Sequence, residues 1–225
     1  MSGDRKQTAD EHAKSVPDVI QQAAKRRSAD FSYDETVIYG NSDIANETVP
    51  ISEQRCRAAM RFKPELSKKL SIAASCALDE ALAAYNLREY DREYVFGENG
   101  KPSFKDHGEI LFNISHAGEY AVAAVCLKGT VTSLGVDIER TEHFNDRIID
   151  YAFSQKEKEC IMAAEDRLSQ ACAIWTAKEA YMKCTGVGLK GGILPVIGEC
   201  GENFSFKEYE APEGYRLTIC CEVKK

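Results

Sequence analysis

The chain has 225 residues and a formal net charge of −7, so it can bury one large hydrophobic core or two smaller ones. The acidic balance argues against a nucleic-acid partner, and the lack of a long apolar stretch argues against a membrane span. No secretory signal is recognisable near Met1, and the nine scattered cysteines show no Cys-x-x-Cys spacing, so we expect reduced thiols in a cytoplasmic protein.

Residues 1–35 are polar and contain few large apolar side chains, so we expect an amino-terminal extension outside the main core. The first half then predicts a strand at 37–39, a helix at 52–62 with Ser52 as its N-cap, a long helix at 66–85, and strands at 94–96, 112–114 and 120–127. Asn, Ser, His and Gly between 113 and 118 are typical of a turn. We therefore expect a turn directly before the last strand.

The second half predicts a strand at 134–139, helices at 146–153, 154–164 and 169–184, and strands at 204–209 and 215–223. Ser154 and Glu157 have the spacing of a capping box that opens a helix. Residues 186–192 are too rich in glycine for regular structure and are interpreted as a connecting turn. The two halves therefore resemble each other in the order of their elements.

The strand at 134–139 carries two carboxylates, Asp137 and Glu139, two positions apart. Side chains at i and i+2 share one face of a strand, so these two should project together, while Val136 and Ile138 face a core. Taken alone, such a pair is more often a plain solvated face. The alternative is half of a cation site.

The helix at 169–184 places Glu179 and Lys183 one turn apart, next to the only tryptophan, Trp175. If this face meets the strand, Asp137, Glu139 and Glu179 converge into an oxygen-ligand set that suits Mg²⁺. Lys183 would then lie within reach of a phosphate oxygen. A helix-surface ion pair is the simpler alternative for Glu179 and Lys183.

Five motifs together resemble the 4′-phosphopantetheinyl transferases of the surfactin-synthetase-activating (Sfp) type. They are G-K-P at 100–102, F-N-I-S-H-A-G at 112–118, G-V-D-I-E at 135–139, F-S-x-x-E at 153–157 and W-x-x-K-E-x-x-x-K at 175–183. The resemblance runs from about residue 37 to the end of the chain, and Ala117 stands where the family usually has Ser. It implies an α+β pseudodimer of two similar α/β subdomains, 36–129 and 130–225, with the active site at their interface.

The resemblance also implies the reaction. The 4′-phosphopantetheine group of coenzyme A would move to a serine of an apo acyl or peptidyl carrier protein, releasing 3′,5′-adenosine bisphosphate. Mg²⁺, or Mn²⁺, would be held by Asp137, Glu139 and Glu179, with Lys178 and Lys183 beside the pyrophosphate. The general base would be Glu179, acting directly or through a metal-bound water, and the enzyme would be a monomer.

For the nucleotide end of coenzyme A, the resemblance implies a site lined by Lys101, Pro102, Ser115 and His116, with Arg61 and Lys69 as weaker candidates. His116 would lie near the 3′-phosphate, whose charge would favour the protonated imidazole. A purely structural His116, and a basic segment at 55–69 that is simply a solvated helix face, are the alternatives.

Two other functions stay open at this point. One is a protein of the same fold that binds carrier proteins or coenzyme A without catalysis. The other is a different Mg²⁺-dependent phosphotransferase acting on a small nucleotide, although the sequence has no P-loop.

Overall fold

The computed structural model describes residues 20–22, 35–41, 50–188 and 195–224. Most of the predicted extension at 1–35, and residues 189–192 of the predicted glycine-rich turn, lie outside these residues. In the described part of the chain, no helix is long and apolar enough to cross a membrane.

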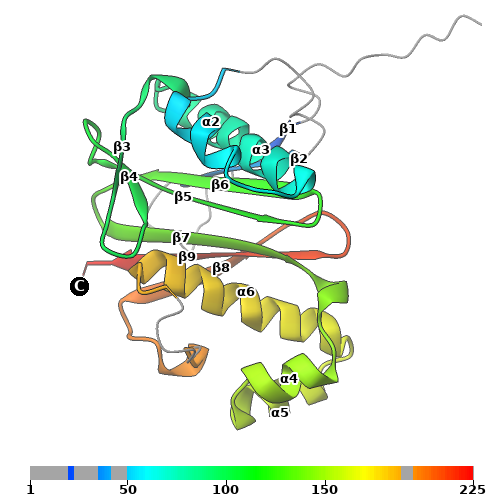
Figure 1. Cartoon of the computed structure of the whole chain (residues 1–225). Helices are drawn as coiled ribbons and strands as arrows, with labels where there is room; N and C mark the ends of the chain where they lie inside the picture. Colours follow the sequence, from blue (N-terminus) through cyan, green and yellow to red (C-terminus); the bar gives the residue numbers. More distant parts are fainter. Residues whose placement is uncertain (1–19, 23–34, 42–49, 189–194, 225) are drawn as a thin grey trace, which may run out of the picture.

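The first half builds a four-stranded antiparallel sheet in the order β1-β2-β6-β5. Its strands are β1 (Ile20–Gln22), β2 (Glu35–Asn41), β5 (Ile110–Ala117) and β6 (Tyr120–Leu127). Two helices, α2 (Glu53–Ala59) and α3 (Glu65–Ala83), cover its outer face (Figure 1). A 3₁₀ turn, η2 (Glu89–Asp91), leads to a small hairpin of β3 (Tyr94–Phe96) and β4 (Pro102–Phe104).

The second half builds a three-stranded antiparallel sheet in the order β7-β9-β8. Its elements are β7 (Val131–Arg140), η3 (Thr141–His143), α4 (Asp146–Ala152), α5 (Gln155–Ala163), α6 (Arg167–Thr185), η5 (Ile197–Glu199), β8 (Phe204–Tyr209) and β9 (Tyr215–Val223). The long helix α6 packs on the outer face of this sheet, and α4 and α5 lie beyond it (Figure 1). Each half therefore combines an antiparallel sheet with helices packed on it, which confirms the predicted α+β fold class.

Alternation along the strands creates two cores on the two faces of β6. Ala121, Ala123 and Val125 point towards α3, whereas Val122, Ala124 and Cys126 point towards β7 and β9. The second core therefore lies between the two sheets and joins the halves of the chain. Val136 and Ile138 are fully buried in it, as the strand pattern predicted.

Two predicted boundaries are wrong for identifiable reasons. The first helix ends at Ala59 rather than 62, because Pro64 disfavours helical backbone in the residue before it and itself caps α3. The expected turn at 113–118 is instead part of β5 up to Ala117. Its backbone pairs with β6, and the side chains of Asn113 and Ser115 are hydrogen-bonded across to β7, so they do not break the strand.

Candidate active site

Asp137 lies at the centre of the candidate site and is only 3% exposed. Its Oδ1 accepts hydrogen bonds from Ser115 Oγ at 2.8 Å and from Lys183 Nζ at 2.6 Å. Lys183 Nζ also donates to Ser115 Oγ at 2.7 Å. The structure thus brings together one residue from each of β5, β7 and α6, and the plain solvated-face interpretation is wrong for Asp137.

Gly135 explains how α6 comes close enough to β7 for this contact. A Cβ at this position would lie 2.1 Å from the backbone oxygen of Ala180 and 2.4 Å from the backbone nitrogen of Cys184. Any side chain here would force the strand and the helix apart. The glycine of the G-V-D-I-E motif therefore sets the distance between Asp137 and Lys183.

Three carboxylates influence one another electrostatically in this region. Burial raises the pKa of Asp137, against the opposing effect of Lys183. Burial, and secondly the charge of Asp137, raise the pKa of Glu139 to about 7. The same two causes raise the pKa of Glu179. Each carboxylate is thus destabilised in its charged form and would gain from a nearby cation.

The carboxylate oxygens near Asp137 are of the type that binds a divalent cation, although among the described residues they do not yet surround a common point. Asp137 Oδ2 is buried and has no hydrogen-bond partner among the described residues, which is the type of atom that a metal ion satisfies. Within the same residues, no group of three or more His, Cys, Asp or Glu is close enough together to hold a metal. Asp137, Glu139 and Glu179 therefore influence one another's pKa values, but in this structure they do not form the shared ligand set that the sequence predicted.

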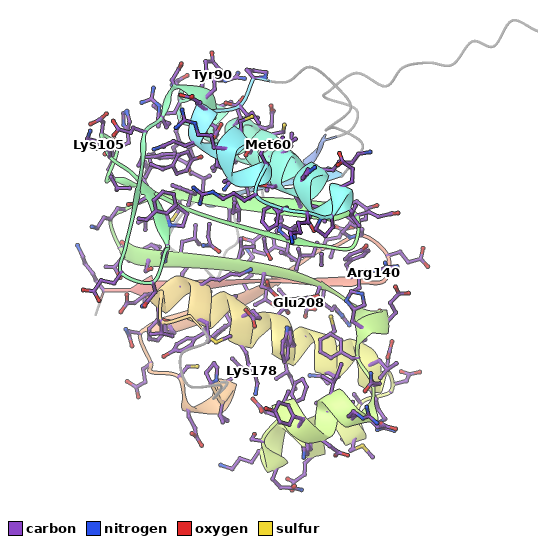
Figure 2. All side chains as sticks on the ribbon, viewed as in Figure 1. Met60, Tyr90, Lys105, Arg140, Lys178 and Glu208 are labelled. Atoms are coloured by element: carbon purple, nitrogen blue, oxygen red, sulfur yellow. The ribbon has the colours of Figure 1, made fainter. Side chains whose placement is uncertain are left out.

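Lys178 does not belong to this group, which corrects its predicted place beside the pyrophosphate. Its side chain is 1% exposed, and its Nζ donates to Glu157 Oε2 at 2.8 Å and to the Ala152 carbonyl at 3.2 Å. Figure 2 shows it on the side of α6 away from β7. Adjacent helical residues point about 100° apart, so Lys178 and Glu179 cannot both face β7.

The partner of Lys178 is the carboxylate of the predicted capping box, which the structure confirms. Glu157 Oε2 accepts from the Ser154 backbone N–H at 2.8 Å, and the Ser154 hydroxyl accepts from the Glu157 N–H. The F-S-x-x-E and W-x-x-K-E motifs are therefore joined by a buried ion pair that fixes α5 against α6. This contact is structural support behind the site.

A cavity of about 470 Å³ lies next to Lys183 and Glu179. Its wall includes Pro102, a predicted nucleotide contact, and Arg55, which the sequence did not single out. Arg55 is held in place by Ser75 Oγ, which accepts from Nε at 2.9 Å, and by the Ser71 carbonyl. Arg61 and Lys69 are not among the lining residues, so Arg55 replaces them as the basic residue that the segment at 55–69 contributes to the cavity wall.

Lys101 and His116, two other predicted nucleotide contacts, have the following surroundings in the ligand-free protein. Lys101 is part of the cavity wall, but its Nζ donates to Ser133 Oγ, to the Leu134 carbonyl and to the Cys184 carbonyl. The pKa of His116 is lowered by desolvation from the surrounding protein and secondly by the Lys183 cation. Without a bound phosphate, both effects therefore disfavour the protonated imidazole, and the predicted effect of a nearby 3′-phosphate on His116 stays a prediction.

Asn113 is a further residue that sequence reasoning did not assign. It is buried, lines the cavity, and its Oδ1 accepts from the Val136 backbone N–H at 2.9 Å. This bond joins the edges of β5 and β7. The sequence did offer a signal for this role. Asn113 carries an amide within an apolar strand, and a buried polar side chain of this kind needs a hydrogen-bond partner.

A second, apolar cavity of about 540 Å³ has Glu139 in its wall. Phe144 and Trp175 form part of its wall, with ring centroids 5.9 Å apart in an edge-to-face arrangement. Tyr151 also lines it and is 91% exposed. Glu139 therefore borders an apolar groove and also feels the charge of the buried Asp137.

Comparisons with known proteins agree with the motif pattern. Residues 133–219 match the family model described as the 4′-phosphopantetheinyl transferase superfamily. The chain is 26% identical to 4′-phosphopantetheinyl transferase Sfp of Bacillus subtilis over 151 residues, which cover 60% of this chain and 66% of that protein. It is 27% identical to psf-1 of Bacillus pumilus, covering 76% and 78%, and 35% identical to gsp of Aneurinibacillus migulanus, covering 55% of each.

The chain is therefore similar to the 4′-phosphopantetheinyl transferase superfamily, with the family model matching residues 133–219 in the second half of the chain. The predicted resemblance to its Sfp type is confirmed. The aligned part spans slightly less than two thirds of the first relative named above.

Proposed function

We propose that the protein transfers the 4′-phosphopantetheine group of coenzyme A to a serine of an apo acyl or peptidyl carrier protein, releasing 3′,5′-adenosine bisphosphate. The observation that carries this proposal is the contact of Asp137, Ser115 and Lys183. It joins three family motifs from distant parts of the chain beside a cavity of about 470 Å³. The match of residues 133–219 to the superfamily model supports the same reaction.

We propose that residues 36–129 and 130–225 act as two subdomains, each with an antiparallel sheet and one long helix, in a monomeric cytoplasmic enzyme. The first sheet also includes β1 from the predicted extension, which pairs with β2, so this part of residues 1–35 joins the first subdomain. The cavity is lined by Arg55 and Pro102 from the first subdomain and by Glu179 and Lys183 from the second. Coenzyme A bound there would contact both subdomains. Arg55 is then placed to attract an anionic phosphate of the nucleotide, and His116 would gain a proton if the 3′-phosphate lies near it.

The proposed metal is Mg²⁺, with Mn²⁺ as the alternative. Asp137 Oδ2, Glu139 and Glu179 would hold it once the side chains of the two glutamates turn towards Asp137, since the three do not form a ready-made ligand group in the described residues. Bound there, it would supply positive charge to the pyrophosphate. The unpartnered oxygen of Asp137 and the raised pKa values of the other two carboxylates support this assignment. Hard carboxylate oxygens are the ligands that Mg²⁺ prefers.

Lys183 and Glu179 have separate proposed roles on the cavity wall. Lys183 uses two of its three N–H donors on Ser115 and Asp137, so the third can donate to a phosphate oxygen. The carrier serine oxygen would bond to the β-phosphorus as the bond from that phosphorus to the adenosine bisphosphate oxygen breaks. Glu179, whose raised pKa makes it a better proton acceptor, would take the serine proton directly or through one water.

The apolar groove beside Glu139 is the proposed docking surface for the carrier protein. Its aromatic wall, including Phe144, Trp175 and the exposed Tyr151, could cover an apolar helix face. Arg147 at the same groove offers a charge for an acidic partner. A carrier docked here would present its serine next to the carboxylates.

The test is incubation of the protein with coenzyme A, Mg²⁺ and a panel of apo carrier proteins, followed by intact-mass spectrometry. Transfer predicts a carrier that is heavier by one phosphopantetheine and the appearance of adenosine bisphosphate. Binding of coenzyme A without mass gain on any carrier would favour the binding-only alternative. Phosphoryl transfer to a small nucleotide, without coenzyme A consumption, would favour the other phosphotransferase.

A further inference from the structure

Lys101 crosses from the first half of the chain to the second. Its Nζ donates to Ser133 Oγ at 2.8 Å, to the Leu134 carbonyl at 3.0 Å and to the Cys184 carbonyl at 2.7 Å. An ammonium group has three N–H donors. All three are therefore used within the protein, and a nucleotide phosphate could bind Lys101 only by breaking one of these bonds.

The acceptors lie on the two elements that carry the catalytic pair. Ser133 and Leu134 belong to β7, a few residues before Asp137. Cys184 is in the last turn of α6 and directly follows Lys183. Lys101 therefore ties the strand that carries the carboxylate to the helix end that carries the lysine.

The last carbonyl groups of a helix have no partner within the helix, and a cation near them is favourable. Two side chains of the β3–β4 hairpin donate hydrogen bonds to carbonyl groups at this end of α6. Besides Lys101, Asn99 donates from Nδ2 to the Gly186 carbonyl at 2.7 Å. Gly186 ends the helix in the left-handed conformation, and a Cβ there would lie 3.6 Å from Lys101 Cδ. The side chain of Lys101 thus runs along the helix end.

We propose that Lys101 is a positioning residue, which holds the carboxyl-terminal end of α6 so that Lys183 stays against Asp137 and Ser115. It is not a ligand of the nucleotide, although it forms part of the cavity wall. This inference rests on the proposed function, because its effect on catalysis passes through Lys183. It replaces the expectation from the sequence that the lysine of the G-K-P motif contacts coenzyme A.

The test compares Lys101→Met, which keeps the length of the side chain and removes the ammonium, with the wild type. A displaced Lys183 should lower kcat by about tenfold to 100-fold, since small displacements of a catalytic group are costly. The Kd of coenzyme A, measured by calorimetry, should stay within about twofold, the pattern for loss of an interaction used only in the transition state. The ratio of kcat/KM for coenzyme A over 3′-dephospho-coenzyme A should not change.

Lys105→Met is the matched control, because Lys105 follows the same hairpin, is exposed, and pairs only with Glu93 in the described residues (Figure 2). It should leave kcat and Kd as in the wild type. In a Lys183→Ala background, adding Lys101→Met should cause no further fall in kcat, since the residue acts through Lys183. If Lys101→Met does not fold, Lys101→Arg replaces it in the same measurements of kcat and Kd. The planar guanidinium group of arginine cannot reproduce the bonds of the ammonium to its three acceptors.

Amide hydrogen exchange gives a readout that is independent of turnover. The Gly186 N–H donates to the Met182 carbonyl, and it should exchange faster in Lys101→Met and unchanged in Lys105→Met. A Lys101 variant that loses coenzyme A affinity with kcat preserved, or with unchanged exchange at Gly186, would overturn the positioning role. Wild-type protein that modifies no carrier would instead overturn the proposed function, while the exchange result would still test the contact.

Discussion

Replacing Lys178 by Met tests whether this lysine supports the fold rather than the phosphate chemistry. The substitution keeps the volume of the side chain but removes the ammonium from a position that is 1% exposed. It deletes the bonds to Glu157 and to the Ala152 carbonyl, together with the contact of the cation over the Phe153 ring. The Glu157 carboxylate then stays buried without its counter-charge.

Breaking a buried ion pair in this way costs about 3–5 kcal/mol of unfolding free energy. Glu157 keeps bonds from the Ser154 and Ile197 backbone N–H groups, so we expect about 3 kcal/mol, the lower end of that range. The exposed pair of Lys105 and Glu93 supplies the control, because Lys105→Met should cost about 0–1 kcal/mol. Equilibrium urea unfolding at pH 7 measures both values.

The pH dependence adds an independent check. Burial alone would raise the Glu157 pKa, but the bonds from Lys178 and Ser154 outweigh it and hold that pKa below its ordinary value of 4.5. A carboxyl with a lowered pKa in the folded state stabilises the protein above pH 4.5, and this contribution is lost as the pH falls through the folded value. The difference between the wild type and Lys178→Met should therefore shrink in acid.

Adding Glu157→Gln to Lys178→Met should recover part of the lost stability, since the uncompensated charge is removed. At a temperature where it is folded, Lys178→Met should bind coenzyme A like the wild type. A cost below about 1 kcal/mol, as for an exposed pair, would refute the structural assignment of Lys178. A large loss of coenzyme A affinity in the folded variant would refute it equally.

Three further predictions concern the strand, the carboxylates and the cavity. Gly135→Ala should lower stability by roughly 1–3 kcal/mol or more through overpacking against α6, while Gly108→Ala, which meets no atom within 4 Å, should not, as thermal unfolding would show. The Glu139 pKa of about 7 lies above its ordinary 4.5, so the free energy of unfolding of the metal-free protein should fall as the pH rises from 4.5 through 7. Glu139→Gln removes the titrating group and should flatten this dependence. Arg55→Met should raise the Kd of coenzyme A, whereas Arg57→Met, at an exposed pair with Glu53, should not; equal effects in calorimetry would contradict the assignment of the cavity.

Local patterns predicted much of the fold, because they depend on side-chain period and capping. The strands at 94–96 and 120–127 agree with β3 and β6, and Ser52 and Ser154 cap their helices as expected. The same two-residue period placed Val136 and Ile138 in the core and Asp137 on the opposite face. These features need no knowledge of distant contacts.

The errors concern contacts between segments far apart in the chain. Residues 113–117 have the composition of a turn, but their partners on β7 hold them in a strand. The ammonium of Lys101 could be assigned to a nucleotide or to carbonyl groups, and only the arrangement of β7 and α6 decides between them. Arg55 was one of several basic residues in its segment, and only the packing of α2 on α3 shows that it reaches the cavity.

The central claim is tested most directly by comparing the wild type with Asp137→Asn on an apo carrier protein. Asn keeps the shape of Asp137 and can still accept from Ser115, but it removes the charge that faces Lys183 and the proposed cation. With coenzyme A and saturating Mg²⁺, intact-mass spectrometry should show one phosphopantetheine added to the carrier by the wild type and none by the folded variant. Transfer by Asp137→Asn at nearly the wild-type rate would contradict the account.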